Sequence, residues 1–105
     1  MARIGQTAQK QINDLVDYYL DHNRPEAIDN LRAAVVTALA RVERPSTRPR
    51  RFPATYSGLA SLGMLWLREH VYWFGYGKAA DGVTTIVNVI HEGANIPARV
   101  EPLPP

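Results

Sequence analysis

Residues able to handle a phosphate group recur in the second half of this chain, where arginine, histidine and glutamate lie close together. Cleavage of RNA through its 2′-hydroxyl needs a base, an acid for the leaving oxygen and a cation beside the phosphorane. The residues of suitable type are Arg50, Arg51, Tyr56, Arg68, His70, His91 and Glu92. We expect Arg68, His70 and the pair His91-Glu92 to converge at one edge of a sheet, with the others beside them.

Each of these residues also has an ordinary structural explanation, which the sequence leaves open. Arg68 can be a solvated turn charge, His91 a mostly buried histidine that alternates with Val87 and Val89, and Tyr56 a core aromatic residue. The chain contains no phosphate-cradling glycine loop, no His-Glu-x-x-His pair and no Gly-x-Ser-x-Gly elbow. The pattern is therefore compatible with a nuclease without requiring one.

Neither a metal centre nor a cofactor is expected. The histidines His22, His70 and His91 are scattered along the sequence, which disfavours a three-histidine metal site. The sequence contains no cysteine, and this excludes disulfides, thiolate metal sites and a cysteine nucleophile.

Charge is distributed unevenly, although the formal net charge is only +2. Aspartates concentrate in the first third, whereas five arginines crowd the middle of the chain: Arg41, Arg44, Arg48, Arg50 and Arg51. This polarity predicts an acidic helical side and a basic loop able to meet phosphates or an acidic partner. The alternative is that the arginines only solubilise a linker.

Length and hydropathy predict a single domain outside the membrane. A chain of 105 residues has the size of one domain. Its N-terminus lacks the apolar run of a secretory signal, and the uncharged stretch 52–67 is broken by Pro53 and two glycines and is too short to span a bilayer. We expect a cytoplasmic protein with no membrane contact.

The first half of the chain has the periodicity of two amphipathic helices. Thr7 is a suitable N-cap for the first helix, and Pro25 is favourable in the first turn of the second, which should end near Arg44, before Pro45. The apolar stripes are Ala8, Ile12, Leu15, Val16 and Tyr19, and then Ile28, Leu31, Val35, Ala38 and Val42. The short link between the stripes predicts an antiparallel helical hairpin.

The second half is dense in β-branched and aromatic residues, which favour strands. We predict strands over residues 64–69, 71–76 and 83–92, a hairpin turn at Asp81-Gly82, and a short N-terminal edge strand at Arg3-Ile4-Gly5. Strict alternation would place Tyr72, Phe74 and Tyr76 on one face of their strand. In the last strand it would place Val83, Val87 and Val89 on one face and Ile86 and Ile90 on the other, a pattern typical of burial on both faces.

The predicted fold class is therefore α+β. It comprises a short N-terminal strand and an antiparallel helical hairpin packed on a small antiparallel β-sheet. We expect one domain over residues 1–100, an extended proline-rich connector at 45–53, and a flexible proline-rich tail at 101–105.

Two stretches of the sequence carry a family resemblance. The first is WLREHVYWFGY, from Trp66 to Tyr76, and the second is IVNVIHEGANIPAR, from Ile86 to Arg99. Preceded by a helical hairpin and a basic loop, they resemble the RelE/ParE superfamily of type II toxins over about residues 8–100. The resemblance implies an α+β toxin held in a hetero-oligomer by a cognate antitoxin, and contact with operator DNA only through that antitoxin.

The superfamily contains two functional branches. RelE-like members cut mRNA on the ribosome with lysines, arginines and a late tyrosine or histidine, whereas ParE-like members, known as plasmid stabilisation toxins, poison DNA gyrase. This chain has one lysine after the helices, Lys78, and no tyrosine after its final strand. The resemblance therefore favours the ParE-like branch. The contact surface it implies comprises Arg50, Arg51, Tyr56, Arg68, His70, His91 and Arg99.

Two alternatives stay open. In a RelE-like ribosome-dependent endoribonuclease, Arg68 would clamp the phosphate, and His91 or Glu92 would move the proton. In a non-toxic or inactivated toxin-like module, the aromatic sheet would merely bind a partner.

Overall fold

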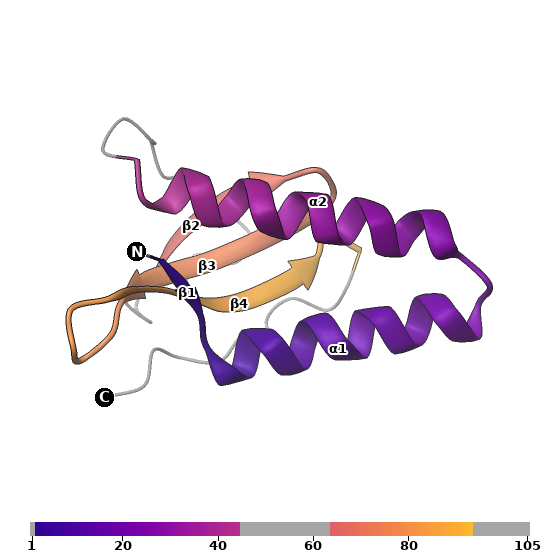
Figure 1. Cartoon of the computed structure of the whole chain (residues 1–105), viewed down its shortest axis with the longest axis horizontal. Helices are drawn as coiled ribbons and strands as arrows, with labels where there is room; N and C mark the ends of the chain where they lie inside the picture. Colours follow the sequence, from indigo (N-terminus) through magenta and orange to yellow (C-terminus); the bar gives the residue numbers. More distant parts are fainter. Residues whose placement is uncertain (1, 45–63, 94–105) are drawn as a thin grey trace.

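Two helices lie side by side over one face of a four-stranded sheet (Figure 1). The computed structural model describes residues 2–44 and 64–93. The elements are β1 (Arg3–Ile4), α1 (Gln6–Asp21), α2 (Pro25–Val42), β2 (Leu65–Glu69), β3 (Tyr72–Lys78) and β4 (Thr84–His91). This arrangement confirms the α+β class and the helical hairpin. Pro45, the expected connector at 45–53 and the tail at 101–105 lie outside the described residues.

The strand order is β1-β4-β3-β2, which places the N-terminal strand at an edge, as predicted. The pairs β2–β3 and β3–β4 are antiparallel, but β1 pairs with β4 in parallel through Arg3 with Thr85 and Ile4 with Ile86. The sheet is therefore mixed, and the expectation of an antiparallel sheet holds only for its last three strands. Parallel pairing needs a connection of a dozen residues or more, and the helical hairpin, β2 and β3 together provide it.

The first helix begins earlier than its sequence predicts. Its N-cap is Gly5 and its first residue is Gln6, so Thr7 lies inside the first turn and is not the cap. The Gly5 N–H donates a hydrogen bond to the Ile86 carbonyl at 2.8 Å, which ties the end of β1 to β4. The tertiary contact therefore decides the start of the helix, and the local preference of threonine is overridden. The second helix ends at Val42, two positions before the expected end.

The predicted alternation holds in β3 but fails in β4. Tyr72, Phe74 and Tyr76 all belong to the core shared with the helices, as expected. In β4 the register shifts, because Tyr76 pairs with Ile86 whereas Gly75 pairs with Asn88. This β-bulge inserts an extra residue, so Ile86 and Val89 both face the helices and the predicted grouping of the β4 valines is wrong.

Both faces of the central strands are buried, as the apolar run in the last strand predicts. The helix-facing core contains Leu31 and Leu67, whereas Trp66, Trp73 and Ile90 are buried outside that core. Gly75 lies directly under Trp66, since a Cβ atom on this glycine would come within 2.9 Å of the indole Cη2. Within residues 2–44 and 64–93, neither helix combines the length and apolar character of a membrane span.

Candidate functional site

Four of the predicted residues meet at one end of the sheet. Arg68 is near the end of β2, and His70 lies in the turn that follows. His91 is the last residue of β4, and Glu92 comes directly after it. The central strand joins them, because Tyr72 pairs with Glu69 on one side and with His91 on the other. The Glu92 N–H donates a hydrogen bond to the Val71 carbonyl at 2.9 Å and extends this ladder past the strand. We call residues 68–72 with 91–92 the turn end of the sheet.

The backbone of the turn end is unusual at His70. Only two residues, His70 and Val71, separate the paired positions Glu69 and Tyr72, and His70 has a φ of 56°. Glycine or asparagine normally occupies such a position in a two-residue hairpin, because positive φ brings a Cβ atom too close to the backbone. Strain of this kind is frequent at functional sites, where the surrounding structure holds it in place. The turn therefore presents an imidazole at the position where glycine would be the most stable choice.

On the sheet face away from the helices, Arg68 forms an ion pair with Glu92. The ion pair joins the Arg68 Nη2 to the Glu92 Oε2, and both side chains are 39% exposed. The Arg68 Nε also donates to the carbonyl of His70 at 3.2 Å. Side chains alternate across a strand, and the neighbouring Leu67 faces the helices, so Arg68 lies on the opposite face.

On the helix-facing side, His91 stands at the edge of an aromatic cluster. Its ring makes an edge contact with Tyr72, with ring centres 5.7 Å apart, and the two hydroxyls of Tyr72 and Tyr19 are 2.5 Å apart in a buried hydrogen bond. Burial, with this hydrogen bond second, raises the pKa of Tyr72 well above its ordinary value near 10. Tyr72 is therefore neutral at physiological pH and cannot serve as a base.

His91 carries its proton on the outer ring nitrogen when it is neutral. The Gly93 N–H donates a hydrogen bond to the His91 Nδ1 at 2.9 Å, so Nδ1 is the acceptor and Nε2 holds the hydrogen. In this tautomer the ring offers a hydrogen-bond donor at Nε2. It does not offer a base there.

Arg41 is a participant that sequence reasoning did not assign to the site. From the last turn of α2 its Nη1 donates to the Glu69 Oε2 at 2.8 Å and to the Arg68 carbonyl at 3.0 Å. Arg41 was visible only as one member of the central arginine group, and nothing in its spacing distinguished it. Tyr19 was likewise visible only as a member of the apolar stripe.

The geometry separates the two groups that a nuclease would have to combine. Arg68 and Glu92 lie on one face of the sheet, whereas His91 and Tyr72 lie on the other. The positively charged group and the imidazole are therefore not aimed at a common point. Among the described residues, no three histidine, aspartate or glutamate side chains are grouped so as to hold a metal ion. Arg50, Arg51, Tyr56 and Arg99 lie outside the described residues.

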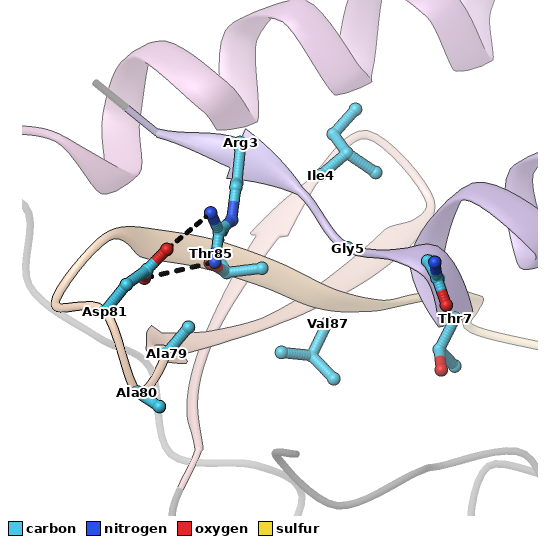
Figure 2. Close-up of a pocket in the computed structure, with 10 residues that line it drawn as sticks. Arg3, Ile4, Gly5, Thr7, Ala79, Ala80, Asp81, Thr85 and Val87 are labelled. Atoms are coloured by element: carbon cyan, nitrogen blue, oxygen red, sulfur yellow. Dashed lines mark hydrogen bonds and ion pairs between the residues drawn. The ribbon is translucent and has the colours of Figure 1, made fainter. Parts of the chain in front are cut away.

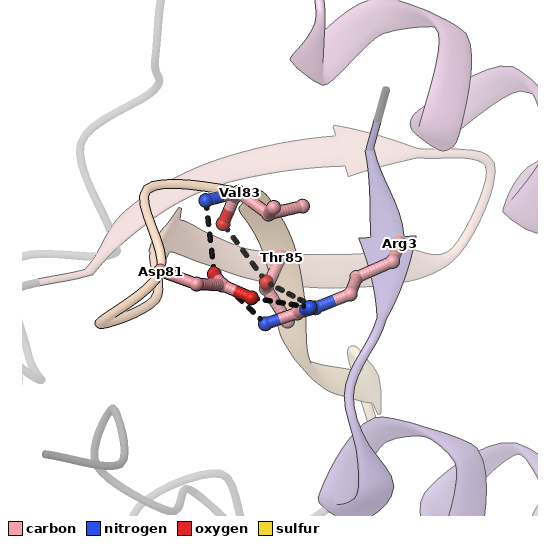
Figure 3. Close-up of polar contacts among 4 residues, drawn as sticks. All are labelled: Arg3, Asp81, Val83 and Thr85. Atoms are coloured by element: carbon pink, nitrogen blue, oxygen red, sulfur yellow. Dashed lines mark hydrogen bonds and ion pairs between the residues drawn. The ribbon is translucent and has the colours of Figure 1, made fainter.

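A second charged cluster lies at the other end of β3 and β4 (Figure 3). It consists of Arg3, Asp81, Val83 and Thr85, and we call it the hairpin end. The Arg3 guanidinium donates to both oxygens of Asp81, at 2.8 and 3.1 Å, and to the Thr85 Oγ1 at 3.2 Å. The Val83 N–H donates to Asp81, and Thr85 donates to the Val83 carbonyl. Each polar group of this cluster is bound to another member.

A hollow of about 520 Å³ adjoins the hairpin end (Figure 2). Arg3, Asp81 and Thr85 lie on one side of it, Thr7 lies on the other, and Val87 stands between them. The charged groups on this rim are engaged with one another. We therefore assign the hairpin end a structural role, which is to fasten β1 to the β3–β4 hairpin.

Comparison with known proteins found no counterpart for this chain. No family model matches it, and neither a curated protein nor a solved structure is significantly similar to it.

Proposed function

We propose that this chain is the toxin of a type II toxin–antitoxin pair, of the ParE-like branch, and that it acts by binding DNA gyrase. The sequence resemblance in 66–76 and 86–99 motivates this proposal. In addition, an N-terminal strand, a helical hairpin and three antiparallel strands follow one another in the order that the resemblance implies.

The observation that carries the choice of branch is the arrangement of the turn end. Arg68 is neutralised by Glu92 on one face of the sheet, while His91 presents a donor nitrogen on the other. RNA cleavage needs a cation, a base and an acid around one phosphate, and these groups are not gathered around one point. The exposed pair, the His70 imidazole on its strained backbone and the His91 donor are instead suited to contact a macromolecular surface.

The partners follow from the same proposal. A cognate antitoxin would cover the turn end in a hetero-oligomer and would carry any contact with operator DNA. The toxin itself would need no cofactor, because inhibition by binding requires no chemistry of its own.

The decisive experiment is a gyrase supercoiling assay with the purified chain, scored for linear DNA released from trapped cleavage complexes. We expect dose-dependent inhibition, which the protein encoded beside this chain should reverse when premixed. The same preparation after heat unfolding is the control for inhibition by contaminants. Intact supercoiling in the presence of a folded chain that is toxic on induction would refute the gyrase target.

A parallel assay decides between the remaining readings. Ribosomes programmed with a defined mRNA should stay intact in the presence of the chain, and primer extension would reveal any cut. Cleavage in the ribosomal A site would identify the RelE-like endoribonuclease, and Arg68, His91 and Glu92 would then be the residues to test by mutation. A folded chain that is not toxic on induction would identify the non-toxic binding module.

A further inference from the structure

The Arg68–Glu92 pair is the most accessible charged contact at the turn end. Both side chains are 39% exposed, so solvent and a partner can reach either of them. An exposed ion pair contributes about 0–1 kcal/mol, because water competes for both charges. A carboxylate from outside the chain therefore needs to overcome only a small preference in order to replace Glu92.

The two members of the pair are held differently. Arg68 lies within β2, and its Nε is fixed on the His70 carbonyl at 3.2 Å, which orients the guanidinium. Glu92 lies just after β4 and is anchored to Val71 through its backbone N–H. Its side chain can therefore swing away while the backbone stays in place. The Arg68 guanidinium therefore has a fixed orientation, whereas the Glu92 carboxylate can be displaced from it.

The charge balance of the turn end indicates what kind of anion would take the place of Glu92. In the described part of the chain, two guanidinium groups, of Arg41 and Arg68, face two carboxylates, of Glu69 and Glu92. Binding to a nucleic acid backbone depends on an excess of positive charge that neutralises several phosphates. A balanced surface with one oriented guanidinium is better suited to a single carboxylate, which arginine binds through directed N–H donors.

We infer that Glu92 occupies, in the unbound chain, the position that an acidic side chain of a protein partner takes on Arg68 in the complex. The inference rests on the proposed function only in taking the partner to be a protein. Glu92 thus acts as an internal competitor, which weakens binding to any acidic segment that does not also contact the rest of the turn end.

The test is a titration of the full-length ¹⁵N-labelled chain with a blocked tetraglutamate peptide, followed through the Nε–H resonance of Arg68. We expect Glu92→Gln to bind the peptide roughly two- to fivefold more tightly than the wild type, which is the range that an exposed pair allows. The matched control is Glu26→Gln, which removes the carboxylate of another exposed pair, Arg24–Glu26, at 3.2 Å. The control should bind like the wild type.

Three results would overturn the inference. Unchanged affinity in Glu92→Gln, or in a second variant, Glu92→Ala, would show that Glu92 does not compete. Equal binding by Arg68→Ala would place the peptide elsewhere. A Glu92→Gln chain that prefers an oligouridylate of matched charge to tetraglutamate would identify phosphate as the ligand. None of these results depends on gyrase, so failure of this inference and failure of the proposed function can be told apart.

Discussion

The same sheet carries an arginine–carboxylate pair at each end, and the two pairs are built differently. At the hairpin end, the Arg3 guanidinium donates hydrogen bonds to both carboxylate oxygens of Asp81 and to the hydroxyl of Thr85. Asp81 also accepts a hydrogen bond from the Val83 N–H. At the turn end, Arg68 meets Glu92 through one nitrogen, beside a residue with a strained backbone. The bidentate pair within a closed network is geometrically fixed, although its side chains are 48% and 51% exposed. A contact through a single nitrogen, outside such a network, is more easily exchanged.

If the proposed function is correct, this difference separates a charge pair that holds the fold together from one that binds a partner. The hairpin end joins β1 to β4, which are far apart in the sequence, so its pair fastens the fold. The turn end is already fastened by the ladder through Tyr72, which pairs with both Glu69 and His91. Its ion pair is therefore not needed to hold the strands together and is available for a partner.

The largest effect that tests this contrast is expected from Arg68→Ala. An arginine at the centre of an interface contributes about 2 kcal/mol or more, so gyrase inhibition should need roughly thirtyfold more protein. Toxicity on induction should be lost as well. The supercoiling assay and growth after induction measure the two effects.

The matched control for Arg68→Ala is Arg3→Ala. It should lower the midpoint of urea unfolding and leave inhibition by the folded chain unchanged. If a folded Arg3→Ala chain loses inhibition while Arg68→Ala keeps it, the roles that we assign to the two ends are reversed.

A second, smaller effect concerns the helix-facing half of the turn end. Tyr72→Phe should lower the free energy of unfolding by about 1–3 kcal/mol, because it leaves the Tyr19 hydroxyl buried without its partner. The double variant Tyr19→Phe/Tyr72→Phe should recover most of this loss, since both hydroxyls are then absent. Urea unfolding gives these values, and Tyr18→Phe, at a residue that is 52% exposed, is the control. If the losses of unfolding free energy from the two substitutions simply add in the double variant, the two hydroxyls do not stabilise the fold through their mutual hydrogen bond.

A third substitution, in the turn between β2 and β3, should increase the free energy of unfolding. His70→Gly should raise the free energy of unfolding by about 1 kcal/mol, because glycine adopts positive φ without strain, although it loses more entropy on folding. Gyrase inhibition should weaken at the same time, since the imidazole is removed. Asn23→Gly is the control, because Asn23 also has positive φ, at 53°, but asparagine tolerates it well. A gain at Asn23 as large as that at His70 would argue against stored strain in the turn.

Local patterns in the sequence were sufficient to predict the elements. The stripes ending at Tyr19 and Val42 predicted both helices, and Asp81-Gly82 predicted the hairpin, where Gly82 indeed has a φ of 81°. The meeting of Arg68, His70, His91 and Glu92 at one end also followed from strand order alone. These features depend on residues close in sequence or on the ends of neighbouring strands.

The features that could not be predicted depend on contacts between distant segments. The bulge in β4, opposite Gly75 and Tyr76, reverses the alternation of the strand. A prediction that ignores the bulge places Val87 on the same face as Val89, whereas only Val89 belongs to the core against the helices. The N-cap moved to Gly5 because its N–H is bound by Ile86 in β4. Arg68 and His91 lie on opposite faces of the sheet because Arg68 pairs with Trp73, whereas His91 pairs with the neighbouring residue Tyr72. The sequence therefore predicts at which end of the sheet such residues lie, but it does not predict on which face of the sheet.

The smallest expected effect is the pH dependence of the hairpin end. The Val83 N–H and then the Arg3 guanidinium hold the pKa of Asp81 below its usual value. A carboxyl group with a depressed pKa in the folded state stabilises the fold above its ordinary pKa, near 4, and loses that contribution as the pH falls further. Asp81→Asn should therefore be less stable than the wild type at pH 7, and the two should converge as the pH falls through the lowered pKa of the folded-state carboxyl group. Urea unfolding across this range measures the difference, which should also shrink at pH 7 in an Arg3→Ala background. A difference that is constant across the range would mean that Asp81 acts through its shape alone and that its charge does not fasten this end of the sheet.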